Sequence, residues 1–137
     1  PGVRRFRCMT DEQRAAAIAE DPLFARIVCR CEQVTEAEIV DAIRRGARTL
    51  DGVKLRIRTG MGRCQGGFCT SRVMKILSRE LGIPMTSITK RGGESRILLY
   101  EIKELLSASS DSVGAVDSDR TLSSGASVDT SGGDSKA

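Results

Sequence analysis

Two pairs of cysteines constrain this chain more than any other feature of its sequence. The first pair is Cys29 and Cys31, and the second is Cys64 and Cys69, which lie in a glycine-rich loop over residues 60–69. Between the pairs is a segment long enough for two short helices. Thiolates held in tight pairs by two loops can grip a metal ion or an iron–sulfur centre from both sides. The pattern therefore predicts that the chain folds around such a centre.

Four kinds of centre compete for these cysteines. A disulfide requires an oxidising compartment, and a Cys-X-Cys disulfide closes a strained ring. A catalytic dithiol usually has a Cys-X-X-Cys motif in a βαβ unit, which is absent. Structural zinc suits four thiolates but favours at least two residues between the cysteines of each arm. A two-iron two-sulfur centre takes two thiolates per iron, so paired ligands from two loops fit it best, with zinc as the main alternative.

The residues around the cysteines refine this interpretation. Gly66 and Gly67 lack a Cβ, so their backbone amides can approach a sulfur closely. Cys8 has no second cysteine nearby and is predicted to be an incidental thiol. Arg30 and Arg63 flank cysteines; they either point inward, which would raise the reduction potential of a bound centre, or face solvent as ordinary arginines.

The composition predicts a single modest domain. The chain has 137 residues with three Phe, one Tyr and no Trp, so its core must be mainly aliphatic. No apolar run approaches the length of a membrane span or of a signal-peptide core. Pro1 is not an initiator residue, so we expect a cytoplasmic piece of a longer protein.

The net charge is positive only in the first part of the chain. Residues 1–106 carry 20 Lys and Arg against 13 Asp and Glu, whereas residues 107–137 carry two against five. Nucleic-acid binding is disfavoured because the basic residues do not alternate with aromatic ones, and the chain has neither histidine nor the signature of a recognition helix. The excess cations instead fit an anionic thiolate-bound centre, whose charge they would offset.

Capping signals and apolar periodicity predict three helices. Capping boxes begin at Thr10, for a helix to about Glu20, and at Thr35, for a helix with Ile39, Val40 and Ile43 inside and a stop at Gly46. The second would place its N-terminus near Cys31. A third helix is expected over residues 70–81, with Cys69 at its N-terminus and Gly82 after it. Residues 49–59 fit a strand or a helix, and the alternation at 53–58 slightly favours a strand.

The remaining segments give weaker patterns. Residues 1–9 are expected to form an extended lead-in, and residues 23–28 an extended apolar segment before Cys29. The apolar run over residues 97–106 is expected to pack back on the helices. Residues 107–137 have almost no large apolar side chain and are predicted to be disordered.

The motifs also resemble a known family. Residues 29–32 with 35–39, followed by 60–69, closely resemble the two-iron two-sulfur domain named for bacterioferritin-associated ferredoxin. The wider context, residues 9–12, Asp21-Pro22 and residues 89–95, looks like the C-terminal region of FAD-dependent, anaerobic-type glycerol-3-phosphate dehydrogenases. The resemblance covers about residues 5–106.

This resemblance implies a small, mainly α-helical domain with a helix-turn-helix-like arrangement, and it favours a helix over residues 49–59. It implies that Cys29, Cys31, Cys64 and Cys69 bind a [2Fe-2S] cluster and that Gly62, Gly66 and Gly67 shape the loop. We expect a lead-in and N-terminal helix over residues 1–22, the cluster-binding domain over residues 23–106 and the tail over residues 107–137. FAD and substrate would bind an N-terminal domain of the parent protein, since no dinucleotide-binding fingerprint is present here.

The function implied is electron transfer. The fragment would have no catalytic site of its own and would relay electrons from the flavin domain of its parent to an acceptor protein or a quinone-linked subunit. Neither nucleic acid nor a membrane span is expected, so any membrane association would be made through a partner. The alternative is a structural or interaction module whose fold a cluster or a zinc ion stabilises.

Overall fold

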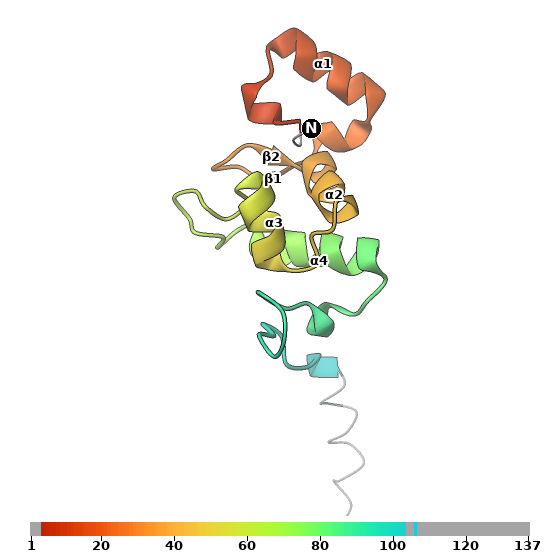
Figure 1. The fold of residues 1–137 in the computed structure, drawn as a ribbon, viewed down its shortest axis with the longest axis vertical. Coiled ribbons are helices and arrows are strands. Elements are labelled where there is room, and N and C mark those ends of the chain that lie inside the picture. The colour runs from red at the N-terminus through yellow and green to blue at the C-terminus, as the bar shows by residue number, and fades with distance from the viewer. Residues whose placement is uncertain (1–3, 104–105, 107–137) are drawn as a thin grey trace, which may run out of the picture. The chain divides into compact units, whose positions relative to one another are not determined.

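The computed structural model describes residues 4–103 and 106. The helices are α1 (Asp11–Glu20), α2 (Glu36–Arg44), α3 (Leu50–Ile57) and α4 (Thr70–Leu81); the strands are β1 (Ile27–Cys29) and β2 (Val34–Thr35); and the 3-10 turns are η1 (Phe6–Cys8), η2 (Pro22–Ala25) and η3 (Met85–Ser87). The described part of the protein is therefore mainly α-helical, as predicted, with one antiparallel hairpin (Figure 1). The predicted disordered tail lies outside the described residues. None of the helices in the described ranges is long and apolar enough to cross a membrane.

The two predicted capping boxes are both present. The Thr10 hydroxyl accepts a hydrogen bond from the Gln13 amide, and the Gln13 side chain accepts one from the Thr10 amide. Thr35 and Glu38 make the same reciprocal pair at the start of α2. Each pair satisfies two N–H groups that the first helical turn leaves without a partner, which fixes where these helices begin.

The ambiguous segment over residues 49–59 is a helix. Val53 and Ile57 lie four residues apart on its buried face, whereas Leu55, which an alternating strand pattern would bury with them, is exposed. The backbone amides of Leu50 and Asp51 donate to the carbonyls of residues 89 and 90, at 3.2 and 2.8 Å. This later segment satisfies the first turn of α3, so long-range contacts decided between the two periodicities.

An aliphatic core forms where α2 packs against α3 and α4 (Figure 1). Ile39 from α2, Ile57 from α3, Leu77 from α4 and Ile88 after η3 are fully buried in it. Among the described residues, this core contains no aromatic side chain, in agreement with the composition. The hairpin contributes Val28, Cys29 and Val34, so the first cysteine arm is anchored in the same core as the helices.

The expectation of an extended lead-in is wrong at η1. Phe6 is buried and stacks on Phe24 with 6.2 Å between the ring centroids. With Ala17 and Ala37 these rings form a second small core. Single aromatic residues give no periodicity, so the sequence offered no signal for this contact.

The expectation of an extended segment over residues 23–28 is half right. Residues 27–29 form β1, but Pro22–Ala25 is a 3-10 turn. The Asp21 side chain accepts from the Leu23 amide at 2.9 Å, and Pro22 has its φ fixed for a first helical position. These two residues therefore start a turn where the apolar run predicted a strand.

The expectation that the apolar run over residues 97–106 packs on the helices is wrong for most of its members. Leu99 is 78% exposed, and Tyr100 and Ile102 are also exposed, whereas Leu98 packs partly on the core. Ile88, by contrast, is completely buried in the core.

Candidate metal centre

The β1–β2 hairpin presents the first cysteine pair. Cys29 ends β1, faces Val34 across the hairpin and is buried, whereas Cys31 is exposed in the connecting turn. Gln33 in this turn has a left-handed backbone conformation, with φ of 49°. The hairpin is thus a tight reversal that places one thiol inside the domain and the other at its surface.

The loop between α3 and α4 presents the second pair. Its path depends on positive φ angles at Arg58, which caps α3, and at Gly60 and Gly66. Cys64 is half-buried within the loop, and Cys69 is buried at the N-cap of α4, as predicted. The second arm therefore repeats the arrangement of the first, with one inner and one outer thiol.

The structure brings the two arms together. The Sγ atoms of Cys31 and Cys64, the outer thiols, are 3.6 Å apart. The inner thiols of Cys29 and Cys69 also interact with each other. All of them line one cavity of about 370 Å³, together with Val28, Arg30, Phe68 and Arg72.

The thiols meet as pairs rather than as one tetrahedral group. Among residues 4–103 and 106, no three His, Cys, Asp or Glu side chains converge closely enough to hold a single metal ion. A mononuclear zinc site needs four ligands around one point, whereas a two-iron centre needs two thiolates at each of two points. The 3.6 Å contact between the Cys31 and Cys64 thiols joins one residue from each arm.

Close packing explains why glycines occupy the loop. A Cβ on Gly62 would lie 2.3 Å from the Cβ of Cys31. At Gly66 a Cβ would lie 2.7 Å from the Thr70 hydroxyl, in a backbone with φ of 89°. Gly67 is less tightly enclosed, since its Cβ would lie 3.3 Å from the Cys64 carbonyl oxygen. Gly62 therefore permits the contact between the arms, and Gly66 permits the turn before α4.

The outer and inner thiols have different electrostatic environments. The backbone N–H groups of Phe68 and Gly66, followed by the Cys31 thiol, hold the pKa of the Cys64 thiol below its usual value. Burial, followed by the neighbouring Cys29 thiol, raises the pKa of the Cys69 thiol to about 11. A buried thiolate at Cys69 would need compensation, which a bound cation supplies.

Other predicted residues lie at the edge of this site or away from it. Cys8 is exposed and does not line the cavity. Arg30 and Arg63 are both exposed, and only Arg30 lines the cavity. The favourable effect of the α2 N-terminus on Cys31 stays a prediction. The amides of Glu36 and Glu38 donate to the Arg26 carbonyl and the Thr35 hydroxyl rather than to that thiol.

Sequence reasoning missed a carboxylate that fastens the hairpin. Glu32 accepts from Arg7 at 2.6 Å and from Arg58 at 3.2 Å. These pairs tie the turn that carries Cys31 to the lead-in and to the end of α3. The position of Glu32 directly after Cys31 was the available signal, but its two partners are distant in sequence.

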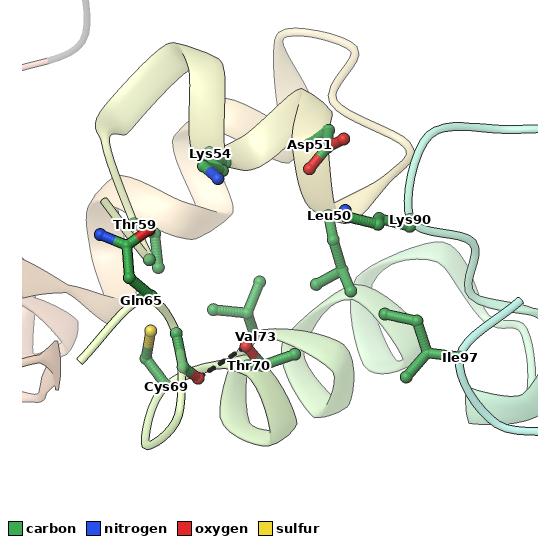
Figure 2. A pocket seen from close by; sticks show the side chains of 12 residues that line it. Leu50, Asp51, Lys54, Thr59, Gln65, Cys69, Thr70, Val73, Lys90 and Ile97 are labelled. Atoms are coloured by element: carbon green, nitrogen blue, oxygen red, sulfur yellow. Dashed lines mark hydrogen bonds between the residues drawn. The ribbon is translucent and has the colours of Figure 1, made fainter. Parts of the chain in front are cut away.

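A second cavity, of about 150 Å³, lies behind the inner thiol (Figure 2). Cys69 lines both cavities, and the second is closed by side chains of α3, α4 and residues 90 and 97. Thr59 Oγ1 is buried there without a hydrogen-bond partner among the described residues. The Thr70 hydroxyl, which also lines this cavity, donates to the Gly66 carbonyl at 2.7 Å and so holds the loop against α4.

Comparison with known proteins identifies a domain that contains both arms. The family model described as "BFD-like [2Fe-2S] binding domain" matches residues 27–79. This range begins at β1 and ends within α4. No solved structure matches the chain significantly.

Several curated proteins are similar to this chain. A glycerol 3-phosphate dehydrogenase of Caloramator mitchellensis is 51% identical over 98 residues, which cover 70% of this chain and 20% of that protein. The hydrogen cyanide synthase subunit HcnB of Pseudomonas aeruginosa is 37% identical over 84 residues, covering 57% and 18% respectively. One subunit of the anaerobic glycerol-3-phosphate dehydrogenase of Escherichia coli K12 is 35% identical over 69 residues, covering 50% and 13%. The chain thus spans at most about a fifth of the length of these relatives.

Proposed function

Because residues 27–79 match the family model of the BFD-like [2Fe-2S] binding domain, we propose that this chain is an electron-transfer module of a larger FAD-dependent oxidoreductase. Its cluster ligands are Cys29, Cys31, Cys64 and Cys69. The observation that carries the proposal is the 3.6 Å separation of the Cys31 and Cys64 Sγ atoms, in a cavity that the other two thiols also line. The two sequence motifs thereby form one site.

The residues present fit a [2Fe-2S] cluster. The donor set is four thiols in two pairs, one inner and one outer. The absence of a Cβ at Gly62 allows the arms to approach, and the amides of Phe68, Gly66 and Gly67 are directed at the Cys64 sulfur. Hydrogen bonds to ligand sulfurs favour the more negative, reduced state of an iron–sulfur centre.

When bound, the cluster supplies one-electron chemistry. The chain's own residues define where electrons enter and leave. Cys29 and Cys69 are buried in the aliphatic core, whereas Cys31 is exposed. Exchange with a partner therefore takes place on the outer side, where Cys31 and Cys64 meet.

The parent protein is proposed from its relatives. Two of the relatives described above are named for glycerol 3-phosphate and one for hydrogen cyanide synthesis. The family domain is thus shared by enzymes of different substrates, and the higher identity favours a dehydrogenase of glycerol 3-phosphate for this chain. FAD and the substrate would bind the N-terminal domain of that parent, in the cytoplasm, and a quinone-linked or soluble partner would accept the electrons.

The domain limits proposed for this function are residues 23–106 for the cluster-binding domain, with residues 1–22 before it and residues 107–137 as a tail. The contact of Phe6 with Phe24 and the hydrogen bond from the Phe6 amide to Glu38, at 3.2 Å, attach the lead-in to the domain. We expect the lead-in to be part of the folded unit.

Anaerobic purification of the 137-residue chain tests this proposal. We expect two iron and two sulfide per chain, visible sulfur-to-iron charge-transfer bands and reversible one-electron reduction in a potentiometric titration. A colourless protein that contains zinc would show that the assignment of a [2Fe-2S] cluster is wrong. A coloured protein that is not reduced reversibly would favour the alternative, in which the cluster only stabilises the fold of an interaction module.

A further inference from the structure

We propose that the surface running from the cysteine cavity along α4 is a docking site for a redox protein with an acidic surface. We call this surface the basic docking face; its cations are Arg26, Arg30, Arg72, Lys75 and Arg79, and its exposed apolar residues are Ile27 and Phe68. The inference rests on the proposed electron-transfer function and names the chemistry of the partner.

The basic docking face is continuous with the cluster site. A groove of about 380 Å³ lies between β1 and α4, and the cysteine cavity adjoins it. Val28 and Arg72 line both. A protein seated in the groove would therefore also cover the opening at which Cys31 is exposed.

The cations of this face are arranged along one side of α4. Arg72, Lys75 and Arg79 follow each other at helical spacing, and all are exposed. Val73, Met74 and Leu77 occupy the opposite, buried side of the helix. Because the apolar side is fixed in the core, the cationic side must face outward.

Internal carboxylates do not neutralise this charge. In the described part of the chain, Arg30, Arg72 and Lys75 have no ion-pair partner, and Arg26 and Arg79 share the single carboxylate of Glu36, at 3.5 and 2.7 Å. Arg79, at the end of the basic docking face, also forms an ion pair with Glu80, at 2.9 Å. The face thus presents a surplus of positive charge that is complementary to carboxylates of a partner.

Apolar residues on the same face favour a protein partner. Phe68 is 82% exposed and Ile27 is 42% exposed, although both border buried residues of the hairpin or of α4. An exposed aromatic side chain within a rim rich in arginine is the usual composition of a protein interface. Phe68 could also insert into a membrane or stack on a base. A redox protein is favoured because this face is continuous with the cysteine cavity, where electrons would be exchanged.

The test uses the cluster-loaded 137-residue chain and an acidic flavodoxin as the probe. Calorimetry measures its affinity, and stopped-flow absorbance measures electron transfer, each at low and high ionic strength. The test variant carries Arg72→Glu with Lys75→Glu. The matched control carries Arg44→Glu with Arg48→Glu, which makes the same change in net charge at exposed residues that line neither the cavity nor the groove.

We expect the test variant to lower the affinity and the second-order rate by about tenfold or more at low ionic strength, because electrostatic steering is lost. The control should stay within about twofold of the parent, and salt should abolish the difference. Phe68→Ser should weaken binding at both ionic strengths. If the double variant loads poorly, Lys75→Glu alone carries the comparison, since Lys75 does not line the cysteine cavity.

Equal losses in the test variant and the control would overturn the proposal, because general charge would then be responsible. It would also fail if the test variant lost affinity for phosphatidylglycerol vesicles or duplex DNA but kept its affinity for flavodoxin. If the chain is reduced reversibly but the variants change neither the affinity nor the rate, only the docking proposal is wrong. If the chain is not reduced reversibly, the proposed electron-transfer function is wrong.

Discussion

The Sγ atoms of Cys31 and Cys64 lie 3.6 Å apart although the residues are 33 positions apart in the chain. The contact joins the turn of the β1–β2 hairpin to the loop before α4. Each arm also contributes a buried thiol, Cys29 or Cys69, beneath this contact. The fold therefore brings the two sequence motifs to one cavity, and the following predictions test whether they hold the proposed centre.

Replacing any one of Cys29, Cys31, Cys64 or Cys69 by Ser should remove most of the bound iron, because each supplies one of the thiolates. Cys8→Ser is the control, since Cys8 is exposed and outside the cavity. Iron analysis of the five variants makes the comparison. An empty site in the Cys8 variant, or a full one in any of the others, would show that the ligand set is wrong.

Gly62→Ala should reduce cluster loading more than Gly67→Ala does. The added methyl would lie 2.3 Å from the Cβ of Cys31, so one arm must move, whereas at Gly67 the closest atom is 3.3 Å away. Iron per chain and the visible spectrum of the two variants measure the difference. Equal loading would mean that the separation of the arms is set elsewhere.

Glu38→Ala should lower the free energy of unfolding by about 2–4 kcal/mol, because it leaves buried donors without an acceptor. The Glu38 carboxyl group accepts from the Thr35 amide and hydroxyl, at 2.8 and 2.9 Å, and from the Phe6 amide, at 3.2 Å. Denaturant unfolding measures the loss. Asp11→Ala, which removes an exposed ion pair with Arg14, is the control and should have little effect.

Removing the cluster should loosen both cysteine arms together. For a small aliphatic core we expect a loss comparable to the whole stability of the domain, about 5 kcal/mol or more. Hydrogen exchange is the better probe, because helices with capping boxes can persist locally. Amides in residues 60–81 should lose their protection in the metal-free chain. Unchanged protection there would show that the fold does not depend on the centre.

The sequence predicted the helix starts because their signals are local. Thr10 with Gln13 and Thr35 with Glu38 satisfy the first helical turns within four residues, and no distant contact is needed. The burial of Val73, Met74 and Leu77 followed from helical spacing alone. The family motif could also be identified from the sequence, because the spacing of the two cysteines within each arm is a local feature.

Long-range contacts decided the features that sequence reasoning misjudged or left open. Residues 49–59 had two competing periodicities, and the donation of the Leu50 and Asp51 amides to residues 89 and 90 supports the helix. Leu99, Tyr100 and Ile102 are apolar yet exposed, which their composition did not predict.

By itself, the sequence determined the mainly helical class, the helix starts and the presence of two closely spaced cysteines in each arm. Capping, periodicity and spacing act over a few residues, so these features can be predicted locally. Only the tertiary structure decided that Cys31 meets Cys64, that Glu32 ties the hairpin to Arg7 and Arg58, and that Arg72 of α4 lines the cysteine cavity. These relationships depend on how α2, α3 and α4 pack, which many weak contacts between distant residues settle together.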